Sequence, residues 1–236
     1  RSPSRGLGDV YKRQVAGNVD LDEVKRLAEK WFGDIKPGVK YERTIPVEPD
    51  QTASHRKVVQ KNVPLDAFYK CWHMPERRDQ RYYIVDLITD ILGGSTSSRL
   101  FQTLVKEKKL FSNIECYHFG SLDKGLLAIE GKLVKGVKPE DAEKAVDEVL
   151  DGIRDNEVDD KELQKVKNKT ESLMAFEDMS LMNRANSLAF YELLGDASLM
   201  NEELDRYNAI TAKEIQDESR RIFSEQNSNT LYYLAQ

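Results

Sequence analysis

Two short triplets, CWH at residues 71–73 and CYH at residues 116–118, each carry a thiol and an imidazole two positions apart. On a β-strand, side chains two positions apart point to the same face, so each triplet would present both groups together. If the two strands were neighbours in register, the four side chains could surround a zinc ion. These side chains are Cys71, His73, Cys116 and His118. Structural zinc sites usually draw ligands from turns, however, and cysteine is an ordinary core residue in apolar strands, so the sequence favours plain sheet packing over a metal.

A second candidate is the stretch GGSTSSRLFQTLVKEKKLF, residues 93–111, whose glycines, hydroxyls and arginine could surround a phosphate. A phosphate-binding P-loop needs wider glycine spacing, a lysine directly before Ser or Thr, and a preceding strand, and the dinucleotide-binding fingerprint also follows a strand. Here a helical pattern precedes the glycines, and no such lysine is present. We interpret the stretch as a corner between two helices, where Gly93 and Gly94 end the first helix and Ser97 or Ser98 caps the second.

Motifs for other hydrolytic chemistry do not occur in the sequence. The histidines His55, His73 and His118 form no i, i+4 pair, and the sequence contains no H-E-x-x-H, H-x-x-E-H or Gly-x-Ser-x-Gly motif. Neither cysteine lies near a predicted helix N-terminus that would activate its thiol. In the helix that begins at residue 139, acidic residues are expected on the solvated face, namely Glu140, Asp141, Glu143, Asp147 and Glu148. We therefore predict no catalytic, substrate-binding or metal-ligating residue.

The composition is that of a chain with a sizeable core and a charged surface. Of its 236 residues, 39% are hydrophobic and 33% are charged. Its 36 Lys and Arg residues against 41 Asp and Glu residues give a formal net charge of −5, with both signs interspersed. Without a basic block, neither nucleic acid nor an anionic membrane surface is an expected partner. No apolar run reaches the ~20 residues of a membrane span, and two cysteines provide no disulfide framework.

The predicted elements that would position these groups belong to segments of very different length. Residues 1–14 lack the apolar core of a leader and share no period with the neighbouring helix, so we expect a foreign segment. Residues 15–37 indicate the end of a strand and a helix, with Asp20 and Glu23 at capping-box spacing. Because this piece cannot bury its own apolar face, we expect it to end a truncated first lobe. Residues 38–55 are expected to be a linker that leads to a second lobe, residues 56–236.

The second lobe combines strand pairs with helices. Strands are predicted at residues 56–62, 66–74, 113–120, 126–134 and 229–236, and helices at 81–92, from 98, from 139, at 159–176, at 181–194 and from 211. Thr211 and Glu214 have the spacing of a capping box. Strand pairs of antiparallel type followed by a cluster of helices indicate an α+β fold, in which a mostly antiparallel sheet packs against helices.

Four segments, taken in order, resemble the pitrilysin/insulinase-type zinc metallopeptidases (inverzincins), and most of all their short-chain bacterial branch, whose relatives include mitochondrial processing peptidase subunits. The segments are VAGNVDLDEVKRLAEKWFGDI, VEPDQ, ILGGSTSSRLFQTLVKEKKLF and KELQKVK. The resemblance covers about residues 15–236, and the Gly-Gly-x-x-Ser-Ser-Arg-Leu corner is its most specific element. It implies two similar α+β lobes in each chain. This sequence resembles the last strand and helix of the first lobe, followed by the whole second lobe.

The resemblance also implies that zinc binding and catalysis belong to the first lobe. In the family, an H-x-x-E-H motif and a distal glutamate of the first lobe bind Zn²⁺, and the glutamate within the motif is the general base for a zinc-bound water. None of these residues is present here. Partner-type lobes carry an arginine and, seven residues later, a tyrosine that hold the substrate peptide, whereas Val105 and Ser112 occupy those positions in this sequence. Valine lacks the charge and donors of arginine, so the sequence resembles the C-terminal, non-catalytic lobe of the zinc-bearing chain.

For function, the resemblance implies a zinc-dependent endopeptidase that degrades or processes peptides in an enclosed chamber. This lobe would support the catalytic lobe, contact a second family chain in a homo- or heterodimer, and be inactive alone. Zn²⁺ is then expected in the full-length protein and not in these residues. One alternative is a structural or assembly subunit of the same family without peptidase activity. Another is a stand-alone binding module that uses the sheet face around the two Cys–His triplets.

Overall fold

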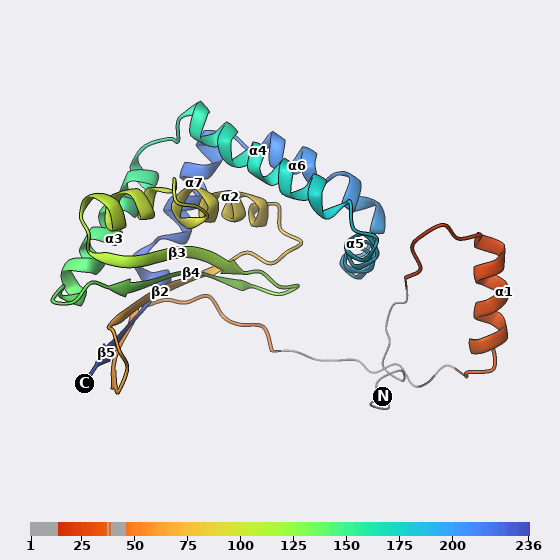
Figure 1. The fold of residues 1–236 in the computed structure, drawn as a ribbon, viewed down its shortest axis with the longest axis horizontal. Helices are drawn as coiled ribbons and strands as arrows, with labels where there is room; N and C mark the ends of the chain where they lie inside the picture. Colours follow the sequence, from red (N-terminus) through yellow and green to blue (C-terminus); the bar gives the residue numbers. More distant parts are fainter. Residues whose placement is uncertain (1–13, 37, 39–45) are drawn as a thin grey trace. The chain divides into compact units, whose positions relative to one another are not determined.

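The computed structural model describes residues 14–36, 38 and 46–236, and its five strands form one sheet in the order β1-β5-β2-β4-β3 (Figure 1). The strands are β1 (His55–Lys61), β2 (Ala67–Met74), β3 (Phe111–Phe119), β4 (Gly125–Leu133) and β5 (Ser228–Ala235). β1 is parallel to β5, and the other neighbours are antiparallel. The final strand therefore lies between the first two, and the predicted α+β class with a mostly antiparallel sheet is confirmed.

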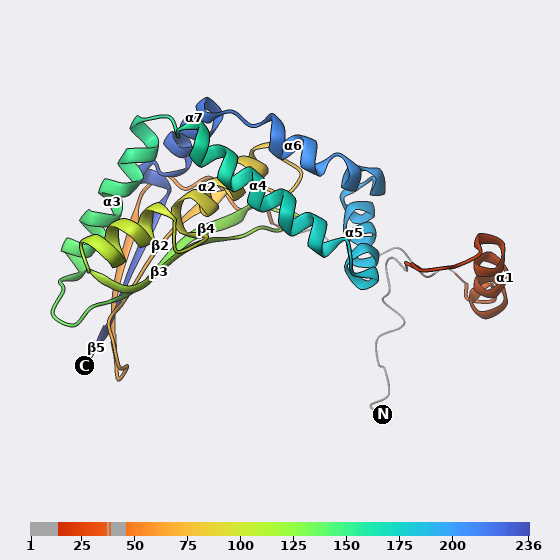
Figure 2. The same ribbon diagram turned by 45° about the horizontal axis from the view of Figure 1, so that its top comes forward.

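Three helices cover one face of the sheet (Figures 1 and 2). They are α2 (Arg81–Gly93), α3 (Pro139–Asp155) and α7 (Ala212–Ile222). α2 packs on β3, α7 packs on β2, and α7 also contacts α2 and α3. Each helix buries an apolar stripe, because its apolar residues recur at three- and four-residue spacing. The core between the layers includes Phe68, Trp72, Leu87, Ile88, Ile91, Leu127, Ile129, Val146 and Ile215.

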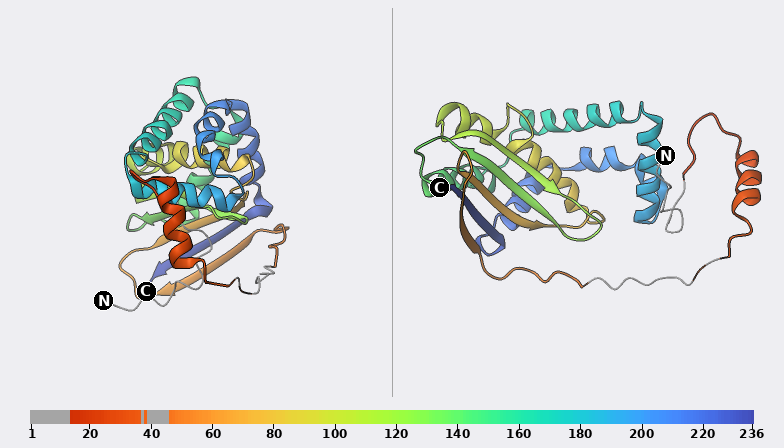
Figure 3. Two further views of the ribbon diagram at one scale, coloured as in Figure 1. Left: turned by 90° about the vertical axis from the view of Figure 1, so that its right-hand side faces the viewer. Right: turned by 60° about the horizontal axis from the view of Figure 1, so that its bottom comes forward.

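The opposite face of the sheet has none of these helices on it (Figure 3). Side chains alternate between the two faces along each strand. In β2, for example, Phe68 and Trp72 are fully buried under the helices, whereas Tyr69, Cys71 and His73 are half-buried and point to the other side. We call this second surface the uncovered face. It is one face of an antiparallel sheet, which can meet water or a partner.

The chain divides into two compact units. The sheet unit consists of Glu48–Glu171 and Leu204–Gln236. It also contains a π-helix, η2 (Phe101–Glu107), a 3-10 turn, η4 (Glu225–Asn227), and most of α4 (Asp160–Glu177) and α6 (Glu203–Ala209). The second unit contains α1 (Leu21–Phe32), α5 (Leu181–Leu194) and η3 (Ala197–Asn201). Among the described residues, no helix is both long and apolar enough to cross a membrane.

Nearly all predicted elements lie within two residues of the observed ones. The predicted caps of α1 and α7 are confirmed, since Asp20 accepts a hydrogen bond from the Glu23 amide at 2.9 Å and Thr211 forms a full capping box with Glu214. The strand end predicted at Val15 is wrong, because residues 14–20 form no strand. A strand needs a neighbour to pair with, and the described sheet is made of β1 to β5 without any residue of this segment. The short helix α6 was not predicted, since seven residues give little periodicity.

Candidate functional site

The two Cys–His triplets cannot form one site. β4 lies between β2 and β3, so the triplets are on strands that do not touch. Cys71 and His73 point to the uncovered face, whereas Cys116 is 5% exposed under α2 and His118 contacts Asp86 of that helix. The described residues contain no group of three or more His, Cys, Asp or Glu that could hold a metal ion. The four side chains therefore lie on two strands that are not neighbours and on opposite faces of the sheet, which excludes a binding module built from all four.

His118 belongs instead to a small polar cluster beneath α2. Its Nε2 lies 2.9 Å from Asp86 Oδ1, and the Tyr207 hydroxyl donates to Asp86 Oδ2 at 2.6 Å. Burial alone would raise the pKa of Asp86, but the hydrogen bonds from His118 and Tyr207 outweigh it and lower that pKa. The cluster joins β3, α2 and α6, so we assign it a structural role.

At the Gly-Gly corner, the end of α2 lies very close to β3. A Cβ added to Gly93 would lie 2.1 Å from the Cys116 backbone nitrogen, so only glycine lets the end of α2 pack this tightly on β3. The helix-to-helix corner is thus confirmed. The predicted serine cap is wrong, because the next helix has no side-chain cap and the buried Ser98 hydroxyl finds no partner among the described residues. The hydroxyl of Ser95 accepts from the Ser97 amide instead.

α4 fastens this corner through charged side chains. Arg99 donates two hydrogen bonds to Glu162, at 3.0 and 2.5 Å. Two lysines of the same helix also reach the loop. Lys165 donates to the Ser97 carbonyl and hydroxyl at 3.3 Å, and Lys169 donates to Asp90 at 2.7 Å and to the adjoining Gly94 carbonyl at 3.1 Å. The arginine of the corner is therefore occupied by an internal carboxylate and does not face a ligand.

The helix after the corner differs from the predicted α-helix. It is a π-helix, whose backbone hydrogen bonds span one residue more than those of an α-helix. Leu100 and Leu104 are fully buried as predicted, but Phe101 and Val105 are only half-buried. Ser112 is exposed at the start of β3, where its hydroxyl donates to the Lys132 carbonyl at 3.2 Å. Neither Val105 nor Ser112 offers a positive charge at these positions.

The residues VEPDQ lead into the sheet along the start of β5. Gln51 donates to the Ser228 carbonyl at 3.0 Å and accepts from the Asn229 side chain at 2.7 Å. Its neighbour Asp50 forms an ion pair with Lys124 at 2.6 Å. Gln51 therefore anchors the segment that precedes β1 to the strand that β1 pairs with.

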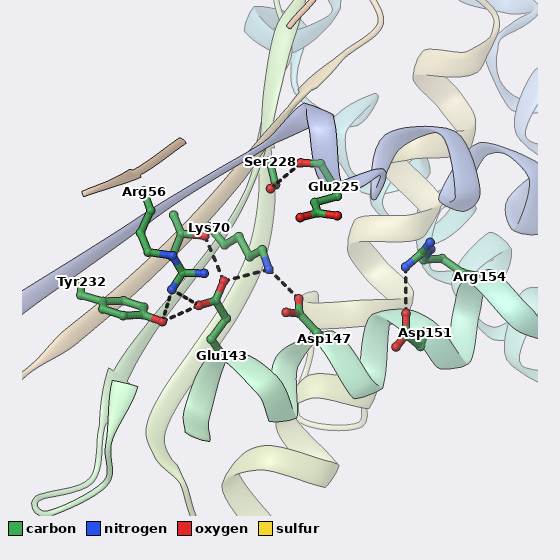
Figure 4. Close-up of polar contacts among 10 residues, drawn as sticks. Arg56, Lys70, Glu143, Asp147, Asp151, Arg154, Glu225, Ser228 and Tyr232 are labelled. Atoms are coloured by element: carbon green, nitrogen blue, oxygen red, sulfur yellow. Dashed lines mark hydrogen bonds and ion pairs between the residues drawn. The ribbon is translucent and has the colours of Figure 1, made fainter. Parts of the chain in front are cut away.

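A cluster of charged residues lies between α3 and the β1 side of the sheet, beside an open pocket of about 530 Å³. Figure 4 shows Glu143 of α3 at its centre. Glu143 pairs with Arg56 of β1 at 2.5 Å and with Lys70 of β2 at 3.0 Å, and it also accepts from the Tyr232 hydroxyl. Lys70 forms a second ion pair, 2.6 Å long, with Asp147 of α3.

The electrostatics of this cluster are those of a satisfied ion-pair network. Burial alone would raise the pKa of Glu143, but hydrogen bonds from Tyr232 and Arg56 and the charge of Lys70 lower it to about 2. Burial raises the pKa of Asp147. The central carboxylate thus stays ionised and holds the edge strand β1 against α3. The cluster has no unpaired central group that could act on a substrate, so its role is to hold these elements together.

The predicted position on a solvated helix face is wrong for Glu143. Its side chain is 8% exposed. The available signal was its position, because Glu143 lies three and seven residues before Val146 and Leu150 and therefore shares their apolar stripe. Lys70 gives the matching signal, since it lies two residues from both Phe68 and Trp72 and so shares their buried face of β2. A buried acid and a buried base in adjoining elements indicate an ion pair.

Comparisons with known proteins agree with this fold. Residues 14–170 match the family model described as the peptidase M16 inactive domain. The chain is 27% identical over 218 residues to the uncharacterized zinc protease YmxG of Bacillus subtilis strain 168, a match that covers 89% of this chain and 51% of the relative. The chain thus spans about half the length of the curated relative that it matches.

Solved structures show the same fold. A protease from Helicobacter pylori superposes with a TM-score of 0.83 at 22% identity, over 92% of this chain and 54% of that one. A peptidase M16 inactive domain from Pseudomonas fluorescens superposes with a TM-score of 0.74 at 15% identity, over 92% of this chain and 52% of that one. The resemblance to inverzincin-type zinc metallopeptidases is confirmed: the chain belongs to the peptidase M16 family, through that family's inactive domain.

Proposed function

We propose that this chain is the non-catalytic C-terminal half of a zinc-dependent endopeptidase that degrades or processes peptides in an enclosed chamber. The observation that carries the proposal is the match of residues 14–170 to the inactive domain, in a chain that spans 51% of a relative named a zinc protease. The described residues do not fit a zinc ion, since they provide no cluster of three suitable ligands. The metal and its general base would therefore come from another lobe.

In this proposal, the chain would hold its helices rigidly on the sheet and would offer one face of the sheet to the peptide. The corner fastened by Arg99 and Glu162, and the Glu143 network that holds β1, keep the helices fixed on one face of the sheet. The uncovered face would then form one rigid side of the peptide chamber. Contacts with the catalytic lobe, and with a second family chain in a homo- or heterodimer, belong to the same proposal.

The experiment is a hydrolysis assay on the purified 236-residue chain with a mixture of internally quenched peptides. We expect no cleavage above the buffer blank, with or without added Zn²⁺. Cleavage that a chelator abolishes and Zn²⁺ restores would contradict the proposal. As a second arm, the coding sequence upstream of residue 15 is expected to encode H-x-x-E-H in the same frame. A degraded motif there would favour the assembly-subunit alternative.

A further inference from the structure

The uncovered face carries an unusual row of side chains that crosses the sheet. The strand register places Leu231 of β5, Tyr69 of β2, Glu130 of β4 and Glu115 of β3 side by side. Two carboxylates thus lie directly opposite each other on neighbouring strands. Like charges at such a position destabilise a sheet, so this row departs from ordinary cross-strand pairing.

The central carboxylate of the row is held in place by two phenols. Tyr69 donates to Glu130 Oε1 at 3.2 Å, and Tyr117 donates to Glu130 Oε2 at 3.0 Å. Burial and the nearby Glu130 raise the pKa of Tyr117 to about 12 and also raise the pKa of Tyr69, so both hydroxyls remain donors at neutral pH. Glu130 is half-buried between them. The carboxylate is therefore oriented by its neighbours, but its charge is not neutralised by them.

No cation of the described chain neutralises this charge. Within the described residues, neither Glu130 nor Glu115 forms a salt bridge, and Glu115 accepts only from the Asn113 amide at 2.9 Å. Lys132 is exposed two residues after Glu130 on the same face but is paired with neither acid. By contrast, Glu143 of the buried network has two cationic partners. The acidic part of the face is thus complementary to a positive charge from outside the sheet.

The surroundings fit a side chain rather than a bare ion. Phe119, 60% exposed, lies edge-on to Tyr117 at a centroid distance of 5.2 Å. Leu126 is 37% exposed on the same face. Aromatic rings attract ammonium and guanidinium groups, and apolar neighbours cover the aliphatic stems of lysine and arginine. An open sheet face also suits an extended chain better than a compact ligand, which usually binds in a concave pocket.

We propose that the part of the uncovered face formed by Tyr69, Glu130, Glu115, Tyr117 and Phe119 receives a lysine or arginine side chain of an extended peptide. This inference rests on the proposed function, in which the face lines a peptide chamber, and it adds a preference for basic peptides. The arginine or lysine head lies between Glu130 and Glu115, its stem lies against Tyr117 and Phe119, and the peptide backbone crosses the sheet. Each contact strengthens binding without any covalent step.

The test measures the affinity of the 236-residue chain for two fluorescent decapeptides by anisotropy. The peptides alternate apolar and neutral polar residues and differ only at one central position, which is arginine or its neutral isostere citrulline. We expect the arginine peptide to bind about 5- to 10-fold more tightly, given the strength of charged hydrogen bonds and cation–π contacts. The preference should shrink at high salt, which screens half-exposed charges.

Variants locate the effect. Glu130→Gln combined with Glu115→Gln should abolish the preference, and Tyr69→Phe should weaken it. Glu157→Gln removes an exposed acid in the α3–α4 connection and should leave the preference unchanged. Equal binding of the two peptides, binding of neither, or a preference that survives the double variant would overturn the inference. Comparing the two peptides on the unaltered chain tests the inference even if a variant does not fold.

Failure of this inference can be distinguished from failure of the proposed function. Chelator-sensitive hydrolysis by the chain alone would refute the non-catalytic role, whatever the peptide preference. Equal affinity for the arginine and citrulline peptides would refute only the basic-side-chain site, and it would leave the hydrolysis result untouched.

Discussion

Arg99 and Glu162 form a two-pronged salt bridge that joins the Gly-Gly corner to α4 across 63 residues of sequence. The two residues belong to two of the segments that carry the family resemblance, ILGGSTSSRLFQTLVKEKKLF and KELQKVK. The physical link between these segments is therefore a structural one. It fixes the first turns of α4 relative to the helix layer on the sheet.

A double-mutant cycle on this pair measures the link. With Arg99→Lys, Glu162→Gln and the double variant, we expect a coupling energy of about 1–2 kcal/mol, because the pair is mostly buried and lysine cannot make both hydrogen bonds. Urea unfolding provides the measurement. The exposed two-pronged pair Glu23–Arg26 of α1 is the control and should give a clearly smaller coupling. Equal couplings would show that burial of the Arg99–Glu162 pair contributes nothing.

Gly93 and Gly94 should respond differently to alanine. In Gly93→Ala the new methyl group would meet the backbone of β3 at Cys116, which cannot move without disturbing the sheet, so we expect a loss of about 3 kcal/mol. In Gly94→Ala the methyl group meets chiefly the side chain of Asp90, and a loss of about 1 kcal/mol is expected. Chemical unfolding of both variants compares them directly. A larger loss for Gly94→Ala would refute the close approach at Gly93.

Lys109 follows the π-helix with φ of 54°, a left-handed conformation that lysine adopts at a cost. Lys109→Gly should therefore stabilise the chain by about 0.5–1 kcal/mol, after the greater freedom of glycine in the unfolded chain is subtracted. Lys106→Gly, within the π-helix, is the matched control and should destabilise the chain by about 1 kcal/mol. Thermal and urea unfolding test both variants. Destabilisation by Lys109→Gly would mean that the lysine side chain contributes more than the strain.

The Glu143 network predicts an acid-sensitive component of stability. The pKa of Glu143 falls from an ordinary 4.5 to about 2 in the folded chain, so its stabilisation is complete above pH 4.5 and is lost as the pH falls toward 2. The shift corresponds to about 3 kcal/mol. Urea unfolding from pH 6 to pH 2 should show this loss in the parent chain.

Glu143→Gln tests the assignment. It should flatten the stability profile between pH 4.5 and pH 2, while the free energy of unfolding at pH 7 falls by about 3 kcal/mol, because Arg56 loses its anion and Lys70 keeps only Asp147. Glu140→Gln removes an exposed acid from the same helix and should change neither quantity strongly. An unchanged acid profile in Glu143→Gln would assign the loss to other carboxylates.

Local patterns in the sequence predicted the helices and strands well, because periodicity and capping depend on residues only a few positions apart. Periodic apolar residues predicted α2 and α3, and the capping residues Asp20 and Thr211 located helix starts. The corner was also predictable, since paired glycines commonly end a helix. Strand pairs followed by helices predicted the α+β class, and the ordered segments indicated the family; the structure and the comparisons confirm both.

Features that depend on distant neighbours were not predictable in this way. The register that sets Glu130 opposite Glu115, and the separation of the two Cys–His triplets by β4, depend on strand order and not on either strand alone. The burial of Glu143 depends on Arg56 and Lys70, which lie on two other elements.

The position of β5 has a consequence for biosynthesis. β1 has β5 as its only neighbour among the described strands, and β5 is the last of the five to leave the ribosome. Until Ser228–Ala235 emerge, β1 has no partner and one edge of β2 is open to other chains. The sheet therefore closes only after β5 has been translated, and chains that are still shorter than this, or that end before β5, would depend on chaperones to shield β1 and β2.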